Sequence, residues 1–257
     1  MNPERRPRRG YSLLELIVTV SLFGLLSALG FLILRNSGKV FATASGRDRA
    51  TAQLIKAEQA LRRDLEMGRP GPASMTVTTA PASLGGGADS DAICFLSAQD
   101  PVTGETQTHL DGSPFWMRNI LYYATVPTDY ASSIGGAMTG GNVGGYDYSC
   151  PAKQLVRVEI DQNTGNNPTV DTTEDQLVTA LAPFLTRPTG VFRSATRKTV
   201  ATQLLMFRCQ PLGAEIRIDL RAVSLDDARR DRGFGATVPY ETGKYTIQHS
   251  LSIFPKN

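Results

Sequence analysis

YSLLELIVTVSLFGLLSALGFLIL, residues 11–34, is the stretch that decides the fold class of this protein. It holds 24 residues, nearly all of them apolar, and its only acidic side chain is Glu15. As an α-helix that rises about 1.5 Å per residue, it can cross a hydrocarbon core of about 30 Å. A secretory signal peptide would end in small residues with an Ala-x-Ala-like cleavage site, which this stretch lacks. We therefore expect a retained transmembrane helix.

A cluster of basic residues comes just before this stretch: Arg5, Arg6, Arg8 and Arg9. Arginines beside a membrane span hold that end of the chain in the cytoplasm, so everything after Arg35 is expected outside it. The cluster also explains the formal net charge of +3, since the chain from residue 11 onward carries 23 basic and 23 acidic side chains. This balance predicts no basic face, and nucleic acid is not an expected partner.

Glu15 is the anomaly within the apolar stretch. A carboxylate inside a membrane helix costs a few kcal/mol on insertion scales. Two interpretations follow from its position near one end of the helix. Either the side chain reaches the lipid headgroups, or a cation of a partner molecule neutralises it.

The residues around Glu15 carry a resemblance to a known family. RRGYSLLELIV, residues 8–18, resembles the N-terminal signature of type IV prepilins and of type II secretion pseudopilins. In that family a prepilin peptidase cuts after the glycine, and the next residue becomes the N-methylated end of the mature chain. The resemblance implies that Gly10 precedes the cut, that Tyr11 is the new N-terminus, and that Glu15 is the glutamate needed for assembly. Tyr11 stands where the family usually has phenylalanine.

Elementary electrostatics agrees with this resemblance. Cleavage would create a cationic α-amine on Tyr11, and Glu15 of a neighbouring subunit would be its counter-charge. In a medium of low dielectric constant such a pair is strong and sensitive to distance. It would therefore set the stagger between adjacent helices.

The resemblance also implies a role, partners and a location. Weaker patterns at residues 120–123, 155–157 and 204–207 resemble PilW-type minor pilins and J-type pseudopilins. A minor pilin primes a type IV pilus and lies at or near its tip. Its partners are other minor pilins, the major pilin, the prepilin peptidase and the inner-membrane assembly platform. The alternatives are a pseudopilin of a type II secretion filament and a membrane-anchored head for adhesion or DNA uptake. All of these place the helix in the inner membrane and the head in the periplasm.

A second apolar pattern follows the membrane stretch. Small or apolar residues recur there at spacings of four and three, which places them on one helical face: Ala50, Leu54, Ala57, Leu61 and Leu65. Gly68 and Pro70 end the pattern. We expect a helix over residues 12–67, with a break allowed in the polar stretch 42–49, packed on the protein's own sheet.

The rest of the chain alternates between strand and loop signals. Residues 71–90, rich in Pro, Ala, Thr and Gly, predict a linker, and residues 176–184 suit a helix or a strand. Strands are expected at 92–97, 118–126, 154–160, 201–208, 215–222 and 245–254. One long helix followed by several strands predicts an α+β pilin fold with an antiparallel sheet. The expected organisation is a leader (1–10), a transmembrane helix (11–34), its amphipathic continuation (35–68) and a β-rich head (69–257).

Catalytic patterns are missing from the sequence. It has no G-x-S-x-G, P-loop or H-E-x-x-H motif. The two histidines, His109 and His249, are interpreted as surface or strand residues. Residues 161–165 begin like a calcium loop but lack its glycine at position six and its glutamate at position twelve. We therefore expect no catalysis, no cofactor and no metal.

The three cysteines, Cys94, Cys150 and Cys209, form no C-x-x-C pair. Outside the cytoplasm one disulfide is expected, and three pairings are open. Cys94 lies in the middle of a predicted strand, as a small buried hydrophobe would. Cys150 and Cys209 lie near loops, so we favour the Cys150–Cys209 pair, with three reduced thiols as the alternative.

Overall fold

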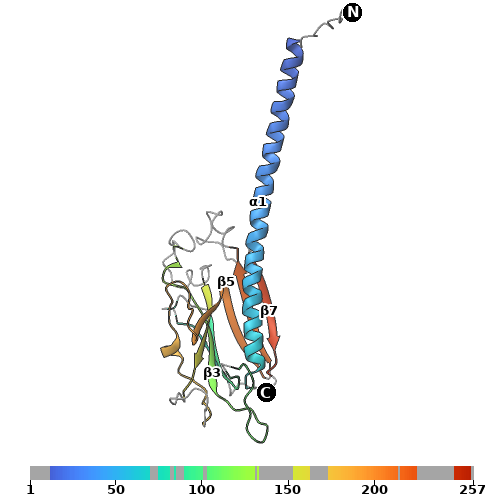
Figure 1. The fold of residues 1–257 in the computed structure, drawn as a ribbon. Helices are drawn as coiled ribbons and strands as arrows, with labels where there is room; N and C mark the ends of the chain where they lie inside the picture. Colours follow the sequence, from blue (N-terminus) through green and yellow to red (C-terminus); the bar gives the residue numbers. More distant parts are fainter. Residues whose placement is uncertain are drawn as a thin grey trace, which may run out of the picture. The chain divides into compact units, whose positions relative to one another are not determined.

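The structure of the chain is a computed structural model (Figure 1). The chain divides into two compact units, Met1–Ser45 and Gly46–Asn257. The structure describes residues 12–69, 75–81, 84, 90–100, 103–130, 132, 153–162, 173–213, 215–224 and 246–255.

The helix α1 (Leu13–Glu66) has 54 residues and belongs to both units. Its bounds agree with the predicted 12–67 to within one residue at each end, and the polar stretch 42–49 does not interrupt it. Hydroxyl groups in this region donate back to carbonyl groups of the preceding turn, for example Ser45 Oγ to Ala42 O at 3.0 Å. Bonded in this way, they do not compete for the helical backbone.

Gly68, just beyond the end of the helix, is a glycine for a steric reason. Its N–H donates to Leu65 O at 3.1 Å, and the chain then pairs with Ser97 in an isolated β-bridge. A Cβ atom at this position would lie 2.9 Å from Cδ2 of Phe95, so only glycine lets the backbone pass this close to the ring.

The second unit contains one seven-stranded antiparallel sheet in which every strand pairs with its neighbours in sequence. The expected α+β fold is confirmed. Its strands are β1 (Met75–Thr79), β2 (Asp91–Ser97), β3 (Arg118–Thr125), β4 (Lys153–Ile160), β5 (Arg197–Leu212), β6 (Glu215–Val223) and β7 (Thr246–Ile253).

The predicted linker over 71–90 was wrong in part, because β1 lies within it. Met75 pairs with Phe95, and Val77 pairs with Ile93. Both β1 side chains pack toward the core while the threonines alternate with them, so the strand has the usual period of two. Strand β1 has only five residues and lies in a stretch rich in Pro, Ala, Thr and Gly, so the sequence pattern was too short to distinguish a strand from a linker.

Each face of the sheet carries a buried apolar cluster. One face packs against the second half of α1, which lies along β5 and β7 in Figure 1. The five residues of the predicted helical stripe, Ala50 to Leu65, are all fully buried there, as expected. The other face, built from β2, β3 and β4, carries a separate apolar cluster that includes Leu121, Tyr123 and Val156.

Residues 176–184, which the sequence left open between helix and strand, cover this second face as an extended segment with a short 3-10 turn, η3 (Ala182–Phe184). Val178 and Leu181 bury their side chains against the sheet. The side chain of Asn119 in β3 bonds to the backbone of this segment, as a neighbouring strand would. Its Oδ1 accepts from Val178 N at 3.0 Å, and its Nδ2 donates to Gln176 O at 3.0 Å.

Strand β5 is longer than predicted, because its two halves pair with different strands. Residues 197–201 pair with β4 and residues 206–212 pair with β6, whereas Leu204 pairs with both strands, and the register of both pairings shifts in this region. Gln203, at the change, has a φ of 63°, a left-handed conformation that non-glycine residues rarely adopt. The neighbouring Thr202 N–H donates to Oε1 of Gln53 on α1 at 3.0 Å, so the helix satisfies this irregular backbone.

Candidate membrane-anchoring and assembly site

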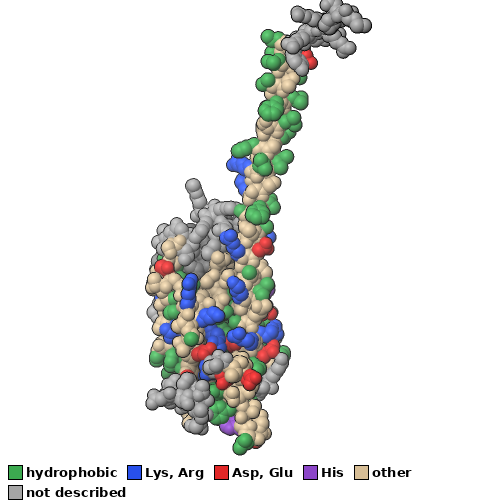
Figure 2. Space-filling view, in the orientation of Figure 1, with side chains coloured by type: hydrophobic (Ala, Val, Ile, Leu, Met, Phe, Trp, Pro, Cys, Tyr) green, Lys and Arg blue, Asp and Glu red, His purple; other side chains and the backbone are tan. Residues whose placement is uncertain are grey.

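The first unit exposes an unusual amount of apolar surface. From Leu13 to Leu34 the large apolar side chains of α1 are between 48% and 78% exposed. They occupy every side of the helix rather than one stripe, and Figure 2 shows them projecting to both sides. By length and composition, α1 contains a segment able to cross a membrane. A helix that is apolar all round needs lipid or other helices around it.

Glu15 lies in the first turn of α1 with its side chain exposed. An acid at this position suits the positive end of the helix dipole. Its backbone carbonyl accepts from Thr19 Oγ1 at 2.7 Å, but its carboxylate has no hydrogen-bond or ion-pair partner among the described residues. The next acidic residue along the chain is Asp48. Among the described residues Glu15 is therefore a lone carboxylate on an apolar surface.

The remaining predicted residues of this site lie outside the described residues. They are the four arginines of the N-terminal cluster, Gly10 and Tyr11. Cleavage after Gly10 and the orientation in the membrane therefore stay predictions. The described chain starts at Ser12, whose carbonyl accepts from Leu16 N at 3.1 Å as the helix begins.

The cysteines are placed only in part. Cys94 is fully buried in β2, as predicted, and burial raises the pKa of its thiol to about 12. Cys209 lies inside β5 rather than beside a loop, and burial, together with the nearby Asp91 and Asp219, raises its pKa well above the usual value. Cys150 lies outside the described residues, so the Cys150–Cys209 pair stays a prediction.

The second unit holds a buried ionic network that the sequence analysis missed. Asp64 of α1 is 1% exposed, accepts from the Tyr122 hydroxyl at 2.8 Å and pairs with the guanidinium of Arg157. Arg157 also pairs with Glu159, which receives a second hydrogen bond from Arg118 at 3.0 Å. The network joins the helix to β3 and β4. Its one signal in the sequence is that Asp64 follows Leu61 by three residues and so falls on the buried face.

Protonation states in this network are fixed by its geometry. Burial lowers the pKa of Arg157, but Asp64, Tyr122 and Glu159 together outweigh that effect and raise it, so Arg157 stays cationic. Burial and the same carboxylate raise the pKa of Tyr122, which therefore remains a neutral donor. The network is an ion pair with a hydrogen-bonded phenol, an arrangement suited to holding two elements in register.

The two histidines have carboxylate neighbours. His109 Nε2 lies 2.9 Å from Glu174 Oε1, and His249 Nδ1, in β7, lies 3.4 Å from Glu58 Oε2. Their interpretation as surface and strand residues is confirmed, since both side chains are at least a third exposed, at 40% and 35%. Within the described ranges no three His, Cys, Asp or Glu side chains form a group that could hold a metal ion.

Comparison with known families bears on the first unit. Residues 5–31 match the family model described as the prokaryotic N-terminal methylation motif. The match includes the arginine cluster, Gly10, Tyr11 and Glu15, and covers 27 of the 257 residues. No curated protein and no solved structure matches the chain.

The motif and the exposed apolar helix together define a class. They support a membrane-anchored, prepilin-type protein of the type IV pilin-like kind. Such a motif is typical of structural proteins that interact with components of pilus assembly.

Proposed function

We propose that this chain is a minor pilin that primes the assembly of a type IV pilus and is incorporated at or near its tip. In this proposal it is a structural subunit and catalyses nothing. Prepilin peptidase removes residues 1–10 on the cytoplasmic side, and Tyr11 becomes the N-methylated end. The mature chain then waits in the inner membrane with its head in the periplasm. Its partners are other minor pilins, the major pilin and the assembly platform.

One observation carries this proposal: the two parts of α1 have opposite surroundings. Large side chains from Leu13 to Leu34 are at least 48% exposed, whereas Ala50, Leu54 and Leu61 are fully buried in the chain's own core. The exposed part needs a cover, which the described residues do not supply. Lipid covers it before assembly, and the helices of neighbouring subunits cover it afterwards, because both are apolar.

Glu15 would direct this exchange of lipid for protein. The α-amine created at Tyr11 of one subunit and Glu15 of its neighbour form an ion pair among apolar side chains. Because the pair is strong only at close range in low dielectric, it favours one stagger between helices over the others. A subunit that keeps this glutamate accepts a neighbour above it, so we place this chain near the tip but not as its outermost member.

The size of the head favours a minor subunit. The unit Gly46–Asn257 contains a seven-stranded sheet, with an extra segment, residues 176–192, layered on its second face. A large head suits an initiating complex better than a densely repeated filament wall. A J-type pseudopilin would share this geometry and differ in its partners. The two functions are therefore distinguished by whether the chain is found in sheared pili.

Gly10→Val should block processing and keep the chain out of filaments, because a branched side chain should not fit a peptidase site shaped for glycine. The measurement is an immunoblot of membrane and sheared-filament fractions from cells that assemble pili. We expect the wild-type chain in filaments at far lower copy than the major pilin. The variant should remain in the membrane with its leader attached.

Gly24→Val, at a helical glycine outside the border motif, is the matched control and should still be processed; a Cβ at Gly24 meets nothing within 4 Å in the structure. A wild-type chain as abundant in filaments as the major pilin would contradict the minor role. Absence from sheared pili, together with a secretion defect on deletion, would favour the pseudopilin.

A further inference from the structure

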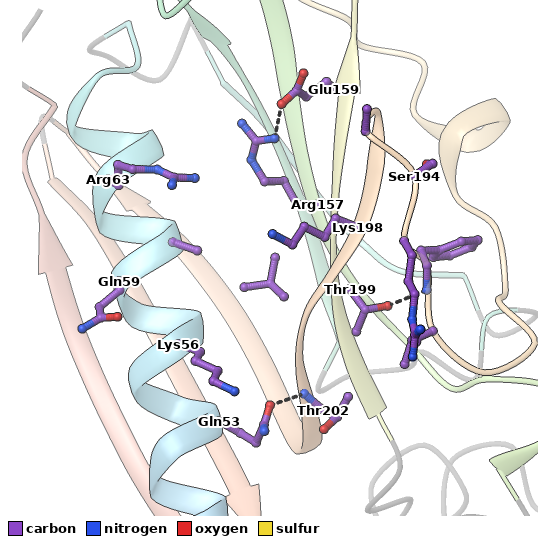
Figure 3. Close-up of a pocket in the computed structure, with 16 residues that line it drawn as sticks. Gln53, Lys56, Gln59, Arg63, Arg157, Glu159, Ser194, Lys198, Thr199 and Thr202 are labelled. Carbon is purple, nitrogen blue, oxygen red and sulfur yellow. Dashed lines mark hydrogen bonds and ion pairs between the residues drawn. The ribbon is translucent and has the colours of Figure 1, made fainter. Parts of the chain in front are cut away.

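An open groove of about 1010 Å³ lies within the second unit, between α1 and the sheet (Figure 3). Lys56 and Arg63 point from the helix toward the strands, and Lys198 points back from β5 toward the helix. Arg193, from the turn that precedes β5, and Arg157 complete the set of cations. The groove is therefore formed by segments that lie far apart in the sequence.

The groove has a large excess of positive charge. Five basic side chains line it, against one carboxylate, that of Glu159. Glu159 is already paired with Arg157 and bonded to Arg118, so it offers little to neutralise the others.

Three of the five cations are available for a ligand. Arg63 and Arg157 are engaged with Asp64. In contrast, Lys56, Arg193 and Lys198 are exposed, and the described part of the chain provides none of them with an ion pair. Since the chain as a whole is almost neutral beyond its first ten residues, this concentration of charge is local.

The floor and walls of the groove are not uniformly charged. Ala60 and Val200 lie at its lining and pack against the apolar core. Gln59, Ser194 and Thr202 add amide and hydroxyl groups to the lining. A ligand with both carboxylates and small apolar side chains would find complementary groups for each.

Bases of a nucleic acid would find no stacking surface here. The only aromatic side chain in the lining is Phe192, which packs against the apolar cluster on the second face of the sheet. The guanidinium of Arg197 lies 5.3 Å from the centre of its ring. Proteins that bind single strands combine a cationic groove with free aromatic faces, and this groove has only the first.

We propose that this groove binds an acidic segment of a partner protein, with carboxylates on Lys56, Lys198 and Arg193 and small apolar side chains on the Ala60–Val200 floor. The charge complementarity gives both attraction and orientation, since a segment of opposite sign is drawn in and a basic one is repelled. The inference does not rest on assembly into a pilus, because every residue involved belongs to the second unit.

The test uses the full-length protein in a nonionic detergent and a short fluorescent peptide in which glutamate alternates with valine. Binding is followed by fluorescence anisotropy at low salt. The double variant Lys56→Glu/Lys198→Glu should bind the peptide about tenfold more weakly or worse, because like charges now face each other. The neutral Lys56→Gln/Lys198→Gln should lie between that variant and the wild type. Added salt should weaken binding to the wild-type protein.

Arg221→Glu is the matched control, because it makes the same change of charge on β6, where Arg221 bonds to Gln248 outside the groove. It should bind as the wild type does. A peptide that does not bind, or binds the wild type and both groove variants equally, would overturn the proposal. So would tighter binding of an oligothymidine of equal charge that is lost in the same variants, which would assign the groove to nucleic acid.

Discussion

Asp64→Ala should destabilise the second unit by about 3 kcal/mol, since the buried Arg157 would keep only one of its two carboxylate partners. The substitution takes one partner from Arg157 and the hydrogen-bond acceptor from the hydroxyl of Tyr122, which is a fully buried residue. Whole domains are stable by only about 5–15 kcal/mol, so this is a large share. The measurement is urea unfolding of the full chain in nonionic detergent, followed by the fluorescence of Trp116, the single tryptophan.

Two further variants make this prediction specific. Asp64→Asn keeps an acceptor for Tyr122 but loses the charge, so its loss of stability should be smaller. Arg62→Ala removes a half-exposed arginine that pairs with Glu58 on the same helix, and it should cost less than about 0.5 kcal/mol. An unchanged unfolding midpoint for Asp64→Ala would show that Glu159 alone compensates Arg157 and that the network does not fix the helix to the sheet.

Glu15→Ala should leave the chain in the membrane and processed, yet stop it from assembling. Insertion becomes easier because a costly polar group is gone, and the peptidase reads the glycine border. Losing about 1.4 kcal/mol at one subunit contact already lowers its equilibrium constant tenfold, so crosslinks to the other minor pilins should fall at least about that much. Filament counts by electron microscopy, at equal protein levels, give the second readout.

Two more substitutions distinguish an ion pair at Glu15 from a contact with the lipid headgroups. Glu15→Asp should be intermediate, because its carboxylate is one methylene short of the same cation. Glu15→Gln keeps the size and loses the charge, so it should fail like alanine if an ion pair is made. Normal assembly of both the Gln and the Ala variants would mean that Glu15 only reaches the headgroups, and the ion-pair mechanism would be wrong.

The sequence predicts α1 and most of the sheet because their signals are local. An unbroken apolar stretch, a stripe from Ala50 to Leu65 and a stop at Gly68 place the helix to within a residue at each end. Alternating strands such as Glu215–Val223 have the same advantage. Strand β1 has five residues and the composition of a linker, so only its pairing with β2 reveals it.

Features that depend on contacts between distant parts of the chain could not be predicted from the sequence. Asp64 is satisfied by Tyr122 and Arg157, which lie 58 and 93 residues away. The crossing of β5 from β4 to β6 depends on a left-handed residue, Gln203, that is not glycine. The cationic groove likewise exists only once α1 lies beside the start of β5. By contrast, the assembly site rests on a contiguous motif, which is why Glu15 could be singled out from the sequence.

Mass spectrometry of the mature N-terminus tests the central claim, that this is a processed subunit of the type IV pilin-like kind, most directly. The chain should be purified from the membranes of cells that contain an active prepilin peptidase. We expect a single N-terminal peptide that starts at Tyr11 and carries one methyl group on its α-amine. An N-terminal peptide that still contains residues 1–10 in such cells would contradict it.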